Sequence, residues 1–137
     1  MLSLTLLLFA NSALAETVNH LCITEVSSGL LFKNGAWIST PFKAGGKYLV
    51  KTEGGSLVSV KEFGAPDEFE MTYCRQLANT LSWVCETNFD SFRFQPSTGK
   101  FVMSQTSGFT SEFKEQGINF PPEGFTPSIS AGHCETM

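Results

Sequence analysis

Two histidines, His20 and His133, are the first residues to consider for chemistry, because imidazole can both bind metals and transfer protons. Each lies within two residues of a cysteine, Cys22 or Cys134, so pairing of those cysteines could bring the imidazoles within reach of each other. Two histidines alone leave a zinc site incomplete. We therefore expect no metal ion and no cofactor, and we expect both histidines to be exposed near the chain ends.

Carboxylates form the second group with possible chemistry. Asp67, Glu68 and Glu70 stand at the start of an expected strand over 68–75, where Glu68 and Glu70 would share one face. A small hydrolase could use such a pair for acid–base catalysis. No G-x-S-x-G nucleophile motif occurs, and disulfide formation would leave no free cysteine as a nucleophile. We expect a solvated acidic strand end and assign no catalytic residue.

The four cysteines are all downstream of residue 15, and an even number in a short exported chain predicts two disulfides. Three pairings are possible. We favour Cys74–Cys85, which closes a short local loop, and Cys22–Cys134, which ties the first strand to the last. A four-cysteine zinc site is disfavoured because no C-x-x-C spacing is present.

Residues 1–15 have the pattern of a signal peptide. An apolar run from Leu2 to Ala10 is followed by Ala13-Leu14-Ala15, the small-x-small pattern of a cleavage site, although no basic residue precedes the run. Residues 16–137 then form a single disulfide-bonded β domain that is periplasmic or secreted. No later segment is apolar enough to span a membrane. The net charge of −4 argues against nucleic acid as a partner.

Turn signals recur at short intervals and separate runs rich in Val, Ile, Phe, Thr and Tyr, which is typical of an all-β protein. We expect a small antiparallel β-barrel or sandwich of about eight to ten strands, preceded by a signal-peptide helix. Apart from two hairpins, the expected strands are 20–26, 47–52, 57–63, 68–75, 81–87 and 127–134. A turn of helix is possible over 75–80.

The two hairpins can be given a register. Asn34-Gly35 predicts a two-residue type I′ turn, which places Phe32 opposite Trp37 and suggests apolar cover on both faces of the hairpin. The turn Pro96–Gly99 places Phe94 opposite Phe101, and Phe92 opposite Met103 in the same way. The second hairpin alternates cleanly between apolar and polar residues, so we expect one buried face and one wet face.

The chain holds 13 phenylalanines, a surplus that predicts an aromatic core or an aromatic binding surface. Residues 104–126 have the least regular pattern and are expected to form a long loop. Within that loop, four phenylalanines are the candidate contacts for an unknown protein or small ligand: Phe109, Phe113, Phe120 and Phe125. The favoured function is accordingly that of an exported, non-enzymatic binding protein.

Two stretches carry a family resemblance: GLLFKNGAWISTPFKAGGKYLVK (29–51), and FRFQPSTGKFVMSQTSGF (92–109) with TPSISAGHC (126–134). They resemble a loose group of small secreted or periplasmic bacterial proteins that have no assigned activity. The resemblance implies export and a β fold, and it transfers no functional residue. Ser107-Gly108-Phe109 also resembles part of a loop of small lysozyme inhibitors, so an inhibitor of a secreted hydrolase is an alternative function.

Overall fold

A computed structural model describes residues 14–106 and 126–137 of the chain. These residues are almost entirely β-structure, as expected, and the proposed signal-peptide helix lies mostly outside them. The strands are β1 (Thr17–Lys33), β2 (Ala36–Phe42), β3 (Lys47–Glu53), β4 (Ser56–Glu62), β5 (Cys74–Gln76), β6 (Trp83–Glu86), β7 (Asp90–Gln95), β8 (Lys100–Gln105) and β9 (Ser128–Thr136). One 3-10 turn, η1 (Asp67–Phe69), precedes β5.

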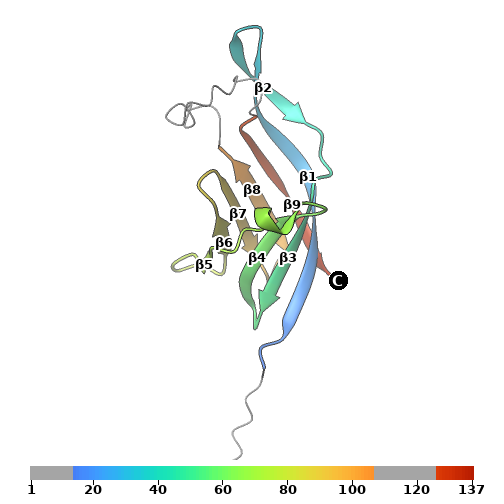
Figure 1. The fold of residues 1–137 in the computed structure, drawn as a ribbon, viewed down its shortest axis with the longest axis vertical. Coiled ribbons are helices and arrows are strands. Elements are labelled where there is room, and N and C mark those ends of the chain that lie inside the picture. The colour runs from blue at the N-terminus through green and yellow to red at the C-terminus, as the bar shows by residue number, and fades with distance from the viewer. Residues whose placement is uncertain (1–13, 107–125) are drawn as a thin grey trace, which may run out of the picture.

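Eight strands form one antiparallel, nearly closed barrel-like sheet in the order β4-β3-β1-β9-β8-β7-β6-β5 (Figure 1). Of the two architectures predicted, the barrel is therefore the one observed. The two ends of the sheet meet through a bridge between Val60 of β4 and Met71, a few residues before β5. Both backbone hydrogen bonds of this bridge are made, at 3.0 Å and 2.8 Å. Closure protects sheet edges that would otherwise be open to other chains.

Strand β1 is much longer than the predicted strand 20–26, because it continues into the first hairpin without a break. It pairs with β3 over its first half, with β2 over its second half, and with β9 on its other side. A bulge between Thr24 and Val26 shifts the register with β9. Such a bulge bends a strand, so β1 can both close the barrel and extend beyond it (Figure 1).

The predicted hairpin registers are confirmed. Phe32 pairs with Trp37 across the Asn34-Gly35 turn, where φ is 53° and 79°, and the two rings lie 5.3 Å apart. The expected cover on both faces is wrong in part, because Ile38 is 43% exposed. This hairpin projects past the barrel, where no second layer of described residues packs on it (Figure 1).

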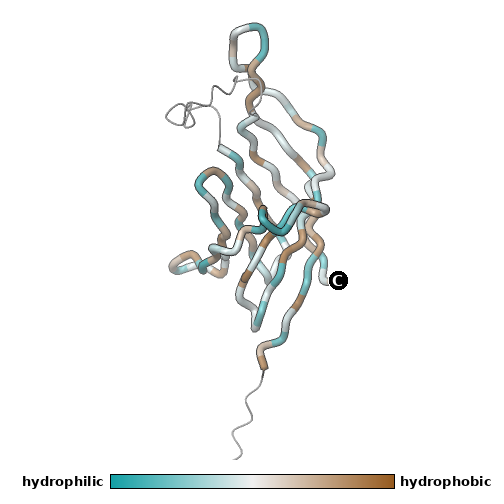
Figure 2. The backbone as a smooth tube through the Cα atoms, viewed as in Figure 1, coloured by the Kyte–Doolittle hydropathy of each residue, from teal (hydrophilic) through white to brown (hydrophobic). Residues whose placement is uncertain are grey.

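The second hairpin, β7–β8, supplies much of the core. Phe94 pairs with Phe101, and Phe92 pairs with Met103, as predicted. All four side chains are buried, and the rings of Phe92 and Phe101 stack with centroids 4.9 Å apart. Arg93, on the other face of β7, is exposed, which confirms the one-wet-face prediction. Apolar and polar segments alternate along the strands (Figure 2).

Both predicted disulfides are present, Cys22–Cys134 and Cys74–Cys85. Each joins residues that face each other on paired strands, β1 with β9 and β5 with β6. Disulfides persist in oxidising, extracellular surroundings, so the fold is suited to such an environment. In residues 14–106 and 126–137, no helix is long and apolar enough to cross a membrane.

The predicted strand over 68–75 is wrong except at its last two residues, where β5 begins. Pro66 and Asp67 turn the chain into η1, so that Phe69 and Tyr73 are exposed while Met71 is buried. An ion pair between Lys61 and Asp67, 2.6 Å long, attaches this turn to β4. The possible helical turn over 75–80 is also not found, because β5 occupies 74–76 and turns follow it.

Candidate binding cavity

A cavity of about 540 Å³ opens at one end of the barrel, and side chains from four strands line its opening, here called the mouth. Tyr48 of β3 and Glu62 of β4 face each other, as do Asp90 of β7 and Gln105 of β8. The segment that carries η1 supplies one more wall, and it is hydrophilic (Figure 2). The cavity is lined by Tyr48, Glu62, Ala65, Pro66, Glu68, Phe69, Glu70, Met71, Thr87, Asp90, Met103 and Gln105.

Part of the wall that joins the cavity to the core is apolar. Met71 and Met103 are buried members of the core and also line the cavity. The ring of Tyr48 packs on Phe92 and Phe101, with centroids 5.4 Å and 5.8 Å away. Burial, with Glu62 and Asp90 nearby, raises the pKa of the Tyr48 phenol. Tyr48 therefore stays neutral at ordinary pH and can donate a hydrogen bond.

Asp90 is half-buried, whereas the other three residues that bring carboxylates to the cavity lining are exposed. It begins β7 on the same face as the buried Phe92, two residues further along the strand. Its backbone is held by Thr87: the Thr87 N–H donates to the Asp90 carbonyl at 2.9 Å, and the Asp90 N–H donates to the Thr87 hydroxyl at 2.9 Å. The Asp90 carboxylate accepts no hydrogen bond from the described residues. Burial raises its pKa, because the charged form is poorly solvated there.

The rim is formed by the segment after β4. Gly64 takes a positive φ of 85°, which reverses the chain directly after Glu62, and the Ala65 N–H donates to the Glu62 carbonyl at 3.0 Å. The Lys61–Asp67 ion pair then anchors η1, and the Met71 bridge returns the chain to β4. The exposed carboxylates of Glu68 and Glu70 lie between these two attachments. The rim is therefore fixed at both ends rather than a free loop.

The cavity has a strongly negative character. Four carboxylates line it, from Glu62, Glu68, Glu70 and Asp90, and no lysine or arginine does. Lys61 also faces Glu70, but its ammonium group pairs with Asp67. In the described part of the chain, no three His, Cys, Asp or Glu side chains converge closely enough to hold a metal ion. The negative charge is therefore spread around the cavity instead of being focused on one point.

The structure brings some of the predicted site residues together and separates others. Glu68 and Glu70 both line the cavity, but they do not share a strand face, because Glu68 belongs to η1. The four candidate contacts Phe109, Phe113, Phe120 and Phe125 lie outside the described residues, as does the Ser107-Gly108-Phe109 segment. Those candidates therefore stay predictions.

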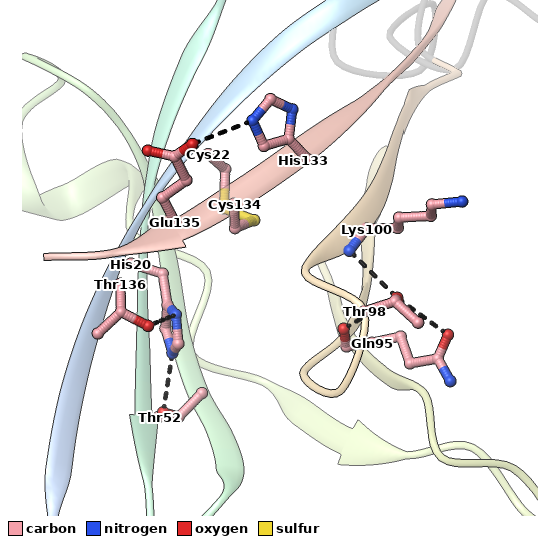
Figure 3. The surroundings of a disulfide bond; sticks show 10 residues. All are labelled: His20, Cys22, Thr52, Gln95, Thr98, Lys100, His133, Cys134, Glu135 and Thr136. Carbon is pink, nitrogen blue, oxygen red and sulfur yellow. Dashed lines mark hydrogen bonds and ion pairs between the residues drawn. A yellow bond between two sulfur atoms is a disulfide. The ribbon is translucent and has the colours of Figure 1, made fainter.

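The two histidines do not meet, contrary to the possibility raised by the sequence (Figure 3). His20 shares the inner face of β1 with Cys22; it bonds the Thr52 hydroxyl at 3.2 Å and lies 5.5 Å from the Phe94 ring. His133 is next to Cys134 and therefore points to the outer face. There its Nδ1 lies 2.6 Å from a Glu25 carboxylate oxygen, and this hydrogen bond raises the pKa of the His133 imidazole. Burial lowers the pKa of the His20 imidazole.

Tyr48, Asp90 and Gln105 are cavity residues that the sequence reasoning missed. A signal for two of them was present, because extending the predicted β7–β8 register by one further inward pair places Asp90 opposite Gln105 on the face of the buried rings. Tyr48 and Glu62 had no such signal, since the sequence does not say which strands share a barrel end. No family model, curated protein or solved structure matches this chain. The family resemblance therefore stays a prediction.

Proposed function

We propose that this protein is an exported, non-enzymatic binding protein of the periplasm or the cell exterior, and that its cavity receives a positively charged alkylammonium group. The observation that carries this proposal is the cavity itself, with four carboxylates and no lysine or arginine in its lining. Its volume of about 540 Å³ is in the usual range for small-ligand sites.

The lining suits an organic cation in two ways. Carboxylates at the rim attract a positive charge before contact, and the half-buried Asp90 can then accept a charge-assisted hydrogen bond. The aromatic rings of Tyr48 and Phe69 lie in the same cavity, and ring faces attract ammonium groups. A spread of carboxylates around an apolar wall favours a ligand with both a charge and a hydrocarbon body over a bare metal ion.

Calorimetric titration of the purified protein with a panel of small molecules tests this proposal. The panel contains butylamine, choline and cadaverine as cations, with butyrate and butanol as charge-reversed and neutral matches. We expect heat from the cations alone. Asp90→Asn should weaken the binding by about tenfold, the loss of about 1.4 kcal/mol of charge-assisted bonding. Glu53→Gln, an exposed change on β3 outside the cavity lining, is the matched control.

The result that contradicts the proposal is binding of butyrate or butanol as strongly as butylamine, or no binding of any probe at millimolar concentration. Equal effects of Asp90→Asn and Glu53→Gln would place the bound cation elsewhere on an acidic surface. Salt should weaken the binding, because surface charges are screened at high ionic strength.

A second candidate function, a hydrolase, is favoured by one observation. The pKa of Asp90 is raised by burial in a cavity that also holds Glu68 and Glu70, and raised carboxyl pKa values are typical of general acids. A hydrolase of this kind requires turnover of an ester or glycoside substrate that disappears in Asp90→Asn and in the double variant Glu68→Gln, Glu70→Gln. Binding of amines without any turnover supports the first function over this one.

A further inference from the structure

The outer face of β1, β9 and β8 carries an exposed apolar patch, on the opposite face of the sheet from the inward-facing cavity residues. Several residues of these strands point inward or are buried, namely Cys22, Thr24, Phe101, Gly132 and Cys134. Because side chains alternate along a strand, their neighbours in the chain point outward. The outward residues that form the patch, here called the outer patch, are Ile23, Val26, Val102, Ile129 and Ala131.

The outer patch is continuous across three strands. Val26 pairs with Ala131, and Ala131 pairs in turn with Val102, so these three side chains form one row. Ile129 and Ile23 extend the patch along the strands on either side of this row. Val26 is 61% exposed and Ile129 is 53% exposed, which is unusual for β-branched residues in the middle of strands.

Charged residues are distributed asymmetrically over the outer patch. Glu25 stands on β1 between Ile23 and Val26, and its carboxylate reaches across to His133 of β9, 2.6 Å away. On the opposite side lie Arg93 of β7, which pairs with Val102, and Lys100 of β8, which pairs with His133. Neither Arg93 nor Lys100 forms an ion pair with any residue in the described ranges. The β1–β9 half of the patch thus holds acids, Glu25 and Glu135, around His133, and the β8–β7 half carries two cations without an ion pair to any described residue.

We propose that a second copy of this chain docks on the outer patch, face to face, about a two-fold axis that runs along the strands between β8 and β9. Such an axis places Ala131 of one copy against Val102 of the other, and the reverse, so the apolar row covers itself. The same rotation places Arg93 of each copy over β1 of its partner, which carries Glu25, and Lys100 over His133 of β9, which is paired with Glu25. A surface with cations on one half and acids on the other is complementary to its own rotated image.

The size of the outer patch sets the expected affinity of the dimer. It spans about 15 Å from β1 to β7 and about 13 Å along the strands, from Ile129 to the row of Ile23 and His133, by standard strand spacings. This is smaller than the roughly 800 Å² per partner of a standard interface. The dimer is therefore expected to be weak, to form at micromolar or higher concentration, and to loosen as salt is added.

Sedimentation velocity over a concentration series tests the proposal with the protein as it is purified from the expressing cells. The wild type should shift from monomer to dimer as concentration rises. Arg93→Glu should raise the dimer dissociation constant by at least about tenfold, because it places an acid next to Glu25 at both symmetry-related contacts. Glu25→Arg should do the same, and an equal mixture of the two variants should associate at least as well as wild type.

Lys33→Glu is the matched control, since it reverses the same charge beside the Asn34-Gly35 turn at the far end of the hairpin. Ile129→Ser is a second, uncharged variant, and it should also weaken the dimer. Native folding of each variant is checked by its near-ultraviolet circular dichroism. A wild type that stays monomeric, an assembly larger than a dimer, or a dimer that Arg93→Glu and Lys33→Glu weaken equally would overturn the proposal. Failure of the mixture to associate would also overturn it.

Discussion

Replacing the cysteines by alanine in pairs should separate the contributions of the two disulfides to stability. Cys22–Cys134 joins residues 112 apart in the sequence, and Cys74–Cys85 joins residues 11 apart. A cross-link stabilises mainly by restricting the unfolded chain, and longer loops are restricted more. The chain-entropy relation assigns about 4.8 kcal/mol to the longer loop and about 2.8 kcal/mol to the shorter one. The difference is about 2 kcal/mol.

The comparison is well matched, because each bridge contains one fully buried cysteine, Cys22 or Cys85, and one half-buried cysteine. The packing lost on substitution by alanine is therefore similar in the two double variants and largely cancels in their difference. Urea unfolding followed by tryptophan fluorescence is a suitable assay, since Trp83 packs against the core. The 22/134 double variant should unfold at a urea midpoint about 1 M below that of the 74/85 variant.

Equal or greater destabilisation of the 74/85 variant would contradict a dominant role for loop closure. That result would mean that native packing around Cys74–Cys85, rather than loop closure, sets the contribution of the bridges. Because small domains are stable by only about 5–15 kcal/mol, the 22/134 variant is also expected to populate its unfolded state measurably at 37 °C. Increased cleavage by an added protease would report this population.

Three further substitutions test details of the fold. Thr24→Val should stabilise the protein by about 1 kcal/mol in urea unfolding, because the buried Thr24 hydroxyl has no hydrogen-bond partner among the described residues. Gly132→Ala should destabilise it by about 3 kcal/mol, since a Cβ there would lie 2.0 Å from the Ile23 carbonyl oxygen. Asp90→Asn should raise the melting temperature at neutral pH, because burial raises the pKa of Asp90 and its charge therefore costs stability. The gain in melting temperature should shrink as the pH falls through the raised pKa of Asp90. It should vanish below the ordinary pKa of an aspartate.

The contrary outcomes are equally specific. A destabilised Thr24→Val variant would indicate that the hydroxyl has a partner in solution. A Gly132→Ala variant as stable as wild type would show that β1 and β9 can separate without cost at this point. A stability gain for Asp90→Asn that is constant with pH would mean that the charge of Asp90 is not its cause.

Local chemistry explains which parts of the fold the sequence predicted. Asn34-Gly35 fixes a hairpin register by itself, because both residues accept a positive φ, and the Phe92–Phe94 alternation fixes the buried face of β7. The disulfides followed from an even cysteine count. The strand over 68–75 failed because the ion pair from Lys61 to Asp67 and the Pro66 turn override the β pattern of Phe69 and Met71.

The cavity was not predicted, for a topological reason. Its polar residues lie at the ends of β3, β4, β7 and β8, and each of them alone resembles an ordinary solvated strand end. Only the strand order brings Tyr48 and Glu62 around to the same mouth as Asp90 and Gln105. The bridge at Met71 that closes the barrel joins strands that are not neighbours in the chain, so the hydrophobic periodicity of the sequence does not predict it.

The most direct test of the central claim is a nuclear magnetic resonance titration of ¹⁵N-labelled protein with butylamine. The cavity account predicts that the largest and saturable shifts fall on the amides of Tyr48, Thr87, Asp90 and Gln105 together with residues 68–71, and that Asp90→Asn reduces them. Shifts that are spread over the acidic surface, or that centre on the outer patch and leave the Asp90 amide unmoved, would contradict it.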